Sequence, residues 1–160
     1  MVSIYCDGSS SGRSSGAGGY GFVVVRGDEV LGWGLGGSPN TTNNLMEIQG
    51  AICGLEAFLA LDLHEAAELV SDSQYTLGMA TGAYNPTTNL EQVASLRLLV
   101  ARVRNLQCRW TPGHMGQKYN ELCDELAREG KLQNTPIELR KQPKIKNAAR
   151  AARRKTKDLL

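Results

Sequence analysis

Residues 3–9 (SIYCDGS) and residues 69–75 (LVSDSQY) are the two stretches that decide the fold. Each begins as a short apolar run, which is typical of a buried strand, and each reaches an aspartate inside a polar motif. Carboxylates at the ends of adjacent parallel strands meet at one edge of an open sheet, where such folds bind ligands. Asp7 and Asp72 are therefore expected to lie side by side.

The apolar patterns around these stretches predict an α/β fold with a five-stranded mixed sheet flanked by helices, in the order β-β-β-α-β-α-α-β-α. We expect strands at 3–7, 20–25, 30–35, 69–71 and 107–111, and helices at 44–60, 74–79, about 93–103 and 118–129. Gly27-Asp28 fits the turn of a hairpin. The Gly/Ser-rich residues 8–19 are expected to form a loop.

Two further carboxylates, Glu47 and Asp124, lie on predicted helices, and each also has an ordinary structural explanation. Asn44 and Glu47 have the spacing of a capping box, in which the glutamate reaches back to the helix start. Asp124 could pair with Arg128 one helical turn later. The two strand-end carboxylates have similar alternatives, because Asp7 could be a turn residue and Asp72 could cap the following helix.

The four carboxylates taken together favour a metal site over four separate structural roles. Mg²⁺ takes oxygen ligands and keeps some of its waters, so a few carboxylates and a substrate phosphate can hold it. Two such ions can divide the activation of water and the stabilisation of the leaving oxygen between them. Without metal, clustered carboxylates raise one another's pKa values.

The motifs around the four carboxylates resemble those of type 1 ribonuclease H, together with Gly18-Gly19-Tyr20-Gly21 and the Pro112-Gly113-His114 loop. The resemblance covers residues 1 to about 131. It implies a ribonuclease H-like fold and endonucleolytic cleavage of the RNA strand of RNA/DNA hybrids, leaving 3′-hydroxyl and 5′-phosphate ends. It also implies two Mg²⁺ ions, replaceable by Mn²⁺, bound by the four carboxylates, and proton transfer or product release by His114.

The same resemblance indicates a set of substrate-binding residues. These are Gly8, Ser9, Thr42, Asn43, Asn44, Gln74 and Asn85. Polar groups of this kind could read the 2′-hydroxyls of RNA, and Thr42 and Asn85 would hold a phosphate of the DNA strand. The structural alternative for Asn43 and Asn44 is helix capping, which is compatible with binding.

The charge is distributed unevenly along the chain. Residues 136–160 carry nine Lys or Arg against two acids, a net charge of +7, whereas the other 135 residues carry nine bases against fourteen acids, a net charge of −5. We expect a catalytic domain at 1–135 and a flexible basic arm at 136–160, whose residues Arg140 to Lys157 contact nucleic-acid phosphates. The arm would replace a basic handle common in the family, because residues 82–92 contain no Lys or Arg. The alternative is a disordered, solubilising tail.

The remaining features indicate an intracellular protein. The apolar stretches are far shorter than the ~18 residues of a membrane span, and the first residues lack a signal-peptide pattern. Four cysteines without Cys-x-x-Cys spacing are expected to be reduced and mostly buried, not zinc ligands. We therefore expect a cytoplasmic monomer. The competing hypotheses are a noncatalytic nucleic-acid-binding module and a strand-transfer or exonuclease domain.

Overall fold

A mixed sheet with the strand order β3-β2-β1-β4-β5 forms the centre of the computed structural model, which describes residues 1–12 and 15–133. The strands are β1 Val2–Ser10, β2 Gly16–Arg26, β3 Glu29–Thr41, β4 Ala67–Ser71 and β5 Gln107–Trp110. The helices are α1 Asn43–Ala60, α2 Gln74–Thr81, α3 Leu90–Arg102 and α4 Lys118–Gln133. The predicted fold class and element order are confirmed, and the basic arm lies outside the described residues.

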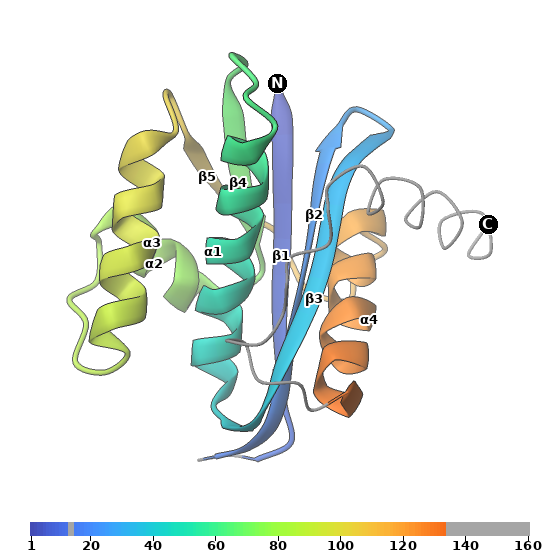
Figure 1. Cartoon of the computed structure of the whole chain (residues 1–160), viewed down its shortest axis with the longest axis vertical. Coiled ribbons are helices and arrows are strands. Elements are labelled where there is room, and N and C mark those ends of the chain that lie inside the picture. Colours follow the sequence, from blue (N-terminus) through green and yellow to red (C-terminus); the bar gives the residue numbers. More distant parts are fainter. Residues whose placement is uncertain (13–14, 134–160) are drawn as a thin grey trace.

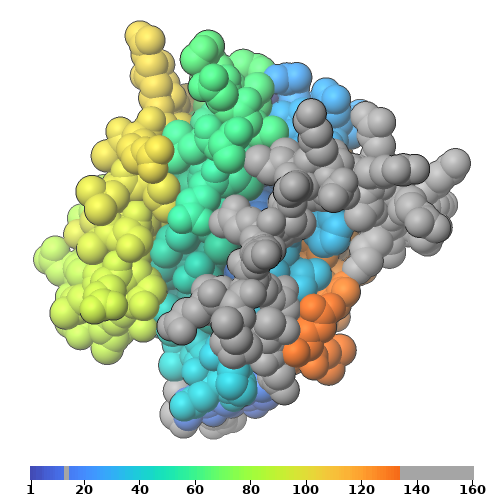
Figure 2. Space-filling view, viewed as in Figure 1, coloured from blue at the N-terminus to red at the C-terminus, as the bar shows by residue number. Residues whose placement is uncertain are grey.

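The two faces of the sheet carry separate apolar cores, with α1, α2 and α3 on one face and α4 on the other (Figure 1). Ile4 and Cys6 of β1 point to the first core, whereas Tyr5 packs against the second. This alternation follows from the two-residue period of a strand. On the three-helix face, α1 and α3 lie side by side (Figure 2).

The strand β1 is central because it pairs on both sides. It is antiparallel to β2 and parallel to β4, with Tyr5 opposite Val70. The parallel pairing sends β1 and β4 toward the same edge of the sheet, so that Asp7 and Asp72 reach this edge together, as the sequence predicts.

The glycine-rich residues 8–19 do not form the long loop that the sequence predicts. Instead β1 extends to Ser10, β2 begins at Gly16, and Ser10 pairs with Gly18. Glycine suits a strand here because helices approach the sheet closely, α1 at Gly8 and α4 at Gly19. A Cβ at Gly19 would lie 2.1 Å from the carbonyl oxygen of Ala127. The predicted hairpin turn is confirmed, with Gly27 at a φ of 58°.

The helix caps differ from the sequence expectation. Thr42, not Asn43 or Asn44, caps α1, because its Oγ1 accepts a hydrogen bond from the Leu45 N–H at 3.2 Å. Ser73, not Asp72, caps α2. A hydroxyl one residue away does the capping in both cases, and the Asp72 carboxylate is left for another role.

Two further properties bear on the sequence expectations. All four cysteines are free thiols, and all but the half-buried Cys108 are buried. None of the helices in residues 1–12 and 15–133 is both long and apolar enough to cross a membrane.

Candidate metal centre

Asp7, Glu47 and Asp72 converge at the edge of the sheet where β1 and β4 end. One carboxylate oxygen of each lies within 4.8 Å of the others. Glu47 comes from the second turn of α1, which is seated directly on β1. A Cβ at Gly8 would lie 2.4 Å from the backbone nitrogen of Glu47, so only glycine allows this contact.

Burial and mutual repulsion make this cluster a poor place for three negative charges. Burial, followed by the charge of Asp72, raises the pKa of Asp7 from 3.8 to about 7. Burial and the charge of Asp7 raise the pKa of Glu47. Among the described residues, neither Lys nor Arg forms an ion pair with any of the three.

The donor set of the cluster fits a hard divalent cation. Glu47 accepts a long hydrogen bond of 3.4 Å from Asn43 at Oε1, while its Oε2 is buried without a hydrogen-bond partner in the described part of the chain. A buried charged oxygen without a partner is costly. A cation bound between the three carboxylates would satisfy this atom and offset their repulsion.

The segment from Trp110 to Asn120 holds Asp72 in place. The Trp110 indole N–H donates to the Asp72 backbone carbonyl at 3.0 Å, and the Asn120 amide donates to Asp72 Oδ2 at 3.5 Å. The sequence interpretation assigned no role to these two residues. Asn120 could have been found, because it precedes Asp124 by four residues and therefore shares its helix face.

Asp124 lies next to the cluster but is not one of the three converging residues. Its charge contributes to the raised pKa of Asp7, so it acts on the same site. Its Oδ2 pairs with Nη2 of Arg128 at 2.6 Å, which is the structural alternative considered for this residue. The structure thus unites three of the four predicted carboxylates and places the fourth beside them in an ion pair.

His114 lies in the loop between β5 and α4, is exposed, and has a φ of 55°. The loop is tied to α4 by a hydrogen bond from the Gly116 N–H to Glu121 Oε1 at 2.9 Å. The neighbouring Gly113 contacts the side chain of Asp72, so the loop that carries His114 reaches the cluster.

The predicted substrate-binding residues lie on several different elements. Gly8 and Ser9 continue β1, Thr42, Asn43 and Asn44 begin α1, Gln74 begins α2, and Asn85 lies in the segment between α2 and α3. Asn43, Asn44, Gln74 and Asn85 are exposed. No hydrogen bond within the described ranges joins Asn85 to Thr42.

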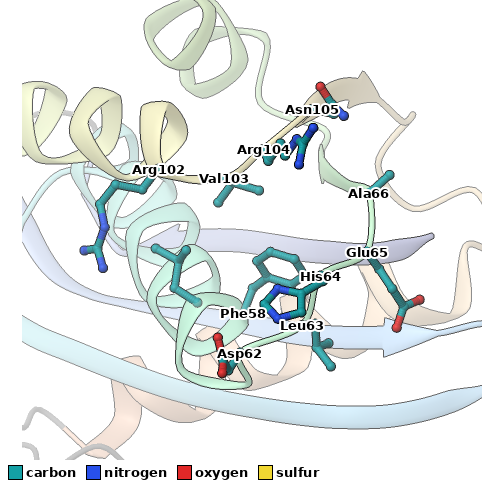
Figure 3. A pocket seen from close by; sticks show the side chains of 11 residues that line it. Phe58, Asp62, Leu63, His64, Glu65, Ala66, Arg102, Val103, Arg104 and Asn105 are labelled. Atoms are coloured by element: carbon teal, nitrogen blue, oxygen red, sulfur yellow. The ribbon is translucent and has the colours of Figure 1, made fainter.

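A separate hollow of about 420 Å³ lies at the opposite end of α1 (Figure 3). Phe58 in its wall follows Glu47 by eleven residues, which corresponds to roughly 16 Å along the helix axis. The exposed His64 and the two arginines Arg102 and Arg104 also line it. This hollow contains none of the predicted site residues.

The sequence profile of the RNase H family matches residues 1–131. The chain belongs to the ribonuclease H family. A ribonuclease H from Caulobacter sp. strain K31 is 38% identical over 146 residues, which cover 81% of this chain and 88% of that protein. The predicted membership of the ribonuclease H family, and with it the assignment as an enzyme, is confirmed.

Solved ribonuclease H structures share this fold. The N-terminal RNase H domain of a Mycobacterium tuberculosis protein, solved as a fusion with maltose-binding protein, superposes with a TM-score of 0.74 at 27% identity, covering 83% of this chain and 94% of that chain. LC11-RNase H1, solved in complex with an RNA/DNA hybrid, superposes with a TM-score of 0.72 at 24% identity, covering 83% and 98%. Ribonucleases H are metal-dependent, which agrees with the acidic cluster at Asp7, Glu47 and Asp72.

Proposed function

We propose that this ribonuclease H cleaves the RNA strand of RNA/DNA hybrids endonucleolytically, leaving 3′-hydroxyl and 5′-phosphate ends. The observation that carries the proposal is the convergence of Asp7, Glu47 and Asp72 within 4.8 Å without a neutralising Lys or Arg among the described residues. The complex of LC11-RNase H1 with a hybrid supports the choice of substrate.

In this proposal Asp7, Glu47, Asp72 and Asp124 hold divalent metal. Their oxygens suit Mg²⁺, and Mn²⁺ can replace it. Two ions bound there would lower the pKa of the attacking water and stabilise the leaving 3′ oxygen. The carboxylates must be ionised to bind metal, and because the pKa of Asp7 is about 7, metal competes with protons below neutral pH.

His114 and Arg128 have different roles beside the carboxylates. His114 is exposed on a loop that touches Asp72, which suits a group that exchanges protons at the reacting phosphate or assists product release. Arg128 orients Asp124 through Oδ2, and in the described part of the chain the other carboxylate oxygen forms no ion pair.

Substrate recognition would involve polar groups on either side of the cluster. Asn43, Asn44 and Gln74 are exposed at the beginnings of α1 and α2, where they can reach 2′-hydroxyls, and Gly8 and Ser9 add contacts from β1. Thr42 and Asn85 would hold the DNA strand. The arm from Arg140 to Lys157 would bind phosphates and so offset the acidic body.

We further propose that the enzyme acts as a monomer in the cytoplasm. One chain supplies all four carboxylates, so the site needs no residue from a second copy. The four free cysteines agree with a reducing compartment.

A substrate comparison tests the proposed activity. The full chain is incubated with the same labelled RNA as a hybrid, as a single strand and in an RNA duplex, with Mg²⁺, Mn²⁺ or a chelator. The proposal predicts efficient cleavage of the hybrid alone and none with chelator. Equal cleavage of single-stranded RNA, or full activity in the chelator, would contradict it.

A further inference from the structure

Gly113 packs against the carboxylate of Asp72. A Cβ built on Gly113 would lie 2.5 Å from Oδ2, 3.4 Å from Cγ and 3.7 Å from Cβ of Asp72, and these are the three nearest atoms. Contacts below 3.0 Å force something to move. Here the atom that must move is an oxygen of the proposed metal site.

The contact differs in kind from that at Gly8. A side chain at Gly8 would meet backbone atoms of Met46 and Glu47, which cannot shift without moving α1. At Gly113 the obstacle is one side chain, which can rotate. The φ of Gly113 is outside the left-handed region, the region in which a side chain would strain the backbone. A substitution there therefore displaces a carboxylate without straining the chain.

The Asp72 side chain cannot rotate without disturbing its hydrogen bond from Asn120, while its backbone stays fixed. The same Oδ2 atom accepts the hydrogen bond from Asn120, and the backbone carbonyl of Asp72 is fixed by Trp110. The backbone is fixed again by the hydrogen bond from the Thr111 N–H to the Ser71 carbonyl at 3.1 Å. Rotation away from residue 113 thus moves the carboxylate relative to Asn120 and to its neighbours in the cluster.

We propose that Gly113 is a positioning residue of the metal centre: the absence of a side chain at this position lets the Asp72 carboxylate stay beside Asp7 and Glu47. The residue acts through Asp72 and needs no contact with the substrate. This inference rests on the proposed metal-binding role of Asp72.

The test compares metal binding by the full-length wild type with that of Gly113→Ala, using calorimetric titration of Mg²⁺ and Mn²⁺ into metal-free protein. Loss of an outer contact to a metal ligand weakens metal affinity or activity by about 10- to 100-fold, and we expect a loss of this size. Thermal unfolding of the metal-free variant should not begin at a lower temperature, because replacing glycine by alanine restricts the unfolded chain. Excess metal should restore hybrid cleavage.

Met115→Ala is the matched control, because Met115 is 70% exposed in the same loop. It should bind metal like the wild type. Wild-type metal affinity in Gly113→Ala would overturn the inference, and so would a loss of affinity accompanied by a large fall in thermal stability. Asp72→Asn separates the two proposals: if it too binds metal normally, the proposed metal site fails, whereas if it alone loses metal, only the role of Gly113 fails.

Discussion

Asp7→Asn is expected to stabilise the metal-free protein at pH 8. The change keeps the size of the side chain and an oxygen that can accept the hydrogen bond from the Gly8 N–H, at 2.7 Å in the native protein. It removes a charge that is buried beside Glu47 and Asp72. The cluster should therefore lose much of its repulsion.

The magnitude follows from the raised pKa of Asp7. Folding raises this pKa from 3.8 to about 7. Each pH unit corresponds to about 1.4 kcal/mol, so ionised Asp7 costs the folded state up to about 4 kcal/mol. Burying the new amide costs about 1 to 3 kcal/mol when its N–H groups lack partners. We therefore expect a net gain in the free energy of unfolding of about 1 to 3 kcal/mol.

The difference in stability between Asp7→Asn and the wild type depends on pH. Folding raises the pKa of Asp7, so the stability of the wild type that depends on a neutral Asp7 is fully present below the unfolded pKa of 3.8. This stability is lost as the pH rises through about 7. The advantage of Asp7→Asn should thus be largest at pH 8 and should shrink by pH 5. The Glu68 pKa is lowered by Arg109, so its contribution changes only below about pH 5 and does not interfere.

The assay is urea unfolding, followed by circular dichroism, in chelator at pH 8 and pH 5. Asp28→Asn, at the exposed hairpin turn, is the control and should change the free energy of unfolding by no more than about 0.5 kcal/mol. Added Mg²⁺ should stabilise the wild type more than Asp7→Asn. A metal-free Asp7→Asn protein that is less stable than the wild type at pH 8 would refute the account of repulsion in the cluster.

Two further predictions concern the His114 loop and the basic arm. His114→Ala should slow hybrid cleavage by roughly 10²- to 10⁴-fold with little change in metal affinity; a large loss of metal binding in calorimetry would instead make His114 a ligand. Ending the chain at Thr135 should preserve the rate on saturating hybrid but weaken binding. If the arm makes three or four phosphate contacts, the slope of log affinity against log salt, measured in Ca²⁺, should become shallower by about 3, and an unchanged slope would exclude them.

The sequence predicts the order of the elements and the meeting of Asp7 with Asp72 because both depend on apolar periodicity and on parallel pairing. It fails at residues 8–19, where glycine favours a loop by its local preference. In the structure these residues extend strands β1 and β2, and the glycines admit helices that are far away in the chain, α1 at Gly8 and α4 at Gly19. Such a tertiary constraint leaves no local signal.

The site shows the same division between local pattern and tertiary contact. The motifs predict Asp7, Glu47 and Asp72 as neighbours, and the structure confirms this. They do not reveal that Trp110 and Asn120 hold Asp72, because these contacts join residues 38 and 48 positions apart. For Asp124, helical spacing predicts the ion pair with Arg128. The same spacing does not predict how far Asp124 lies from the other three carboxylates.

Hybrid cleavage by Asp72→Asn shows whether the carboxylate cluster binds the metal that cleavage needs. The variant keeps the size of the side chain and an oxygen that can face Asn120, but it removes a charge that bound metal needs. Cleavage of a labelled hybrid and equilibrium binding of the same hybrid are measured in parallel with the wild type, with the 5′ and 3′ ends of the products mapped. We expect cleavage to fall by several orders of magnitude while binding persists, and the wild type to leave 5′-phosphate and 3′-hydroxyl ends. Cleavage by Asp72→Asn at a rate close to that of the wild type would contradict this expectation.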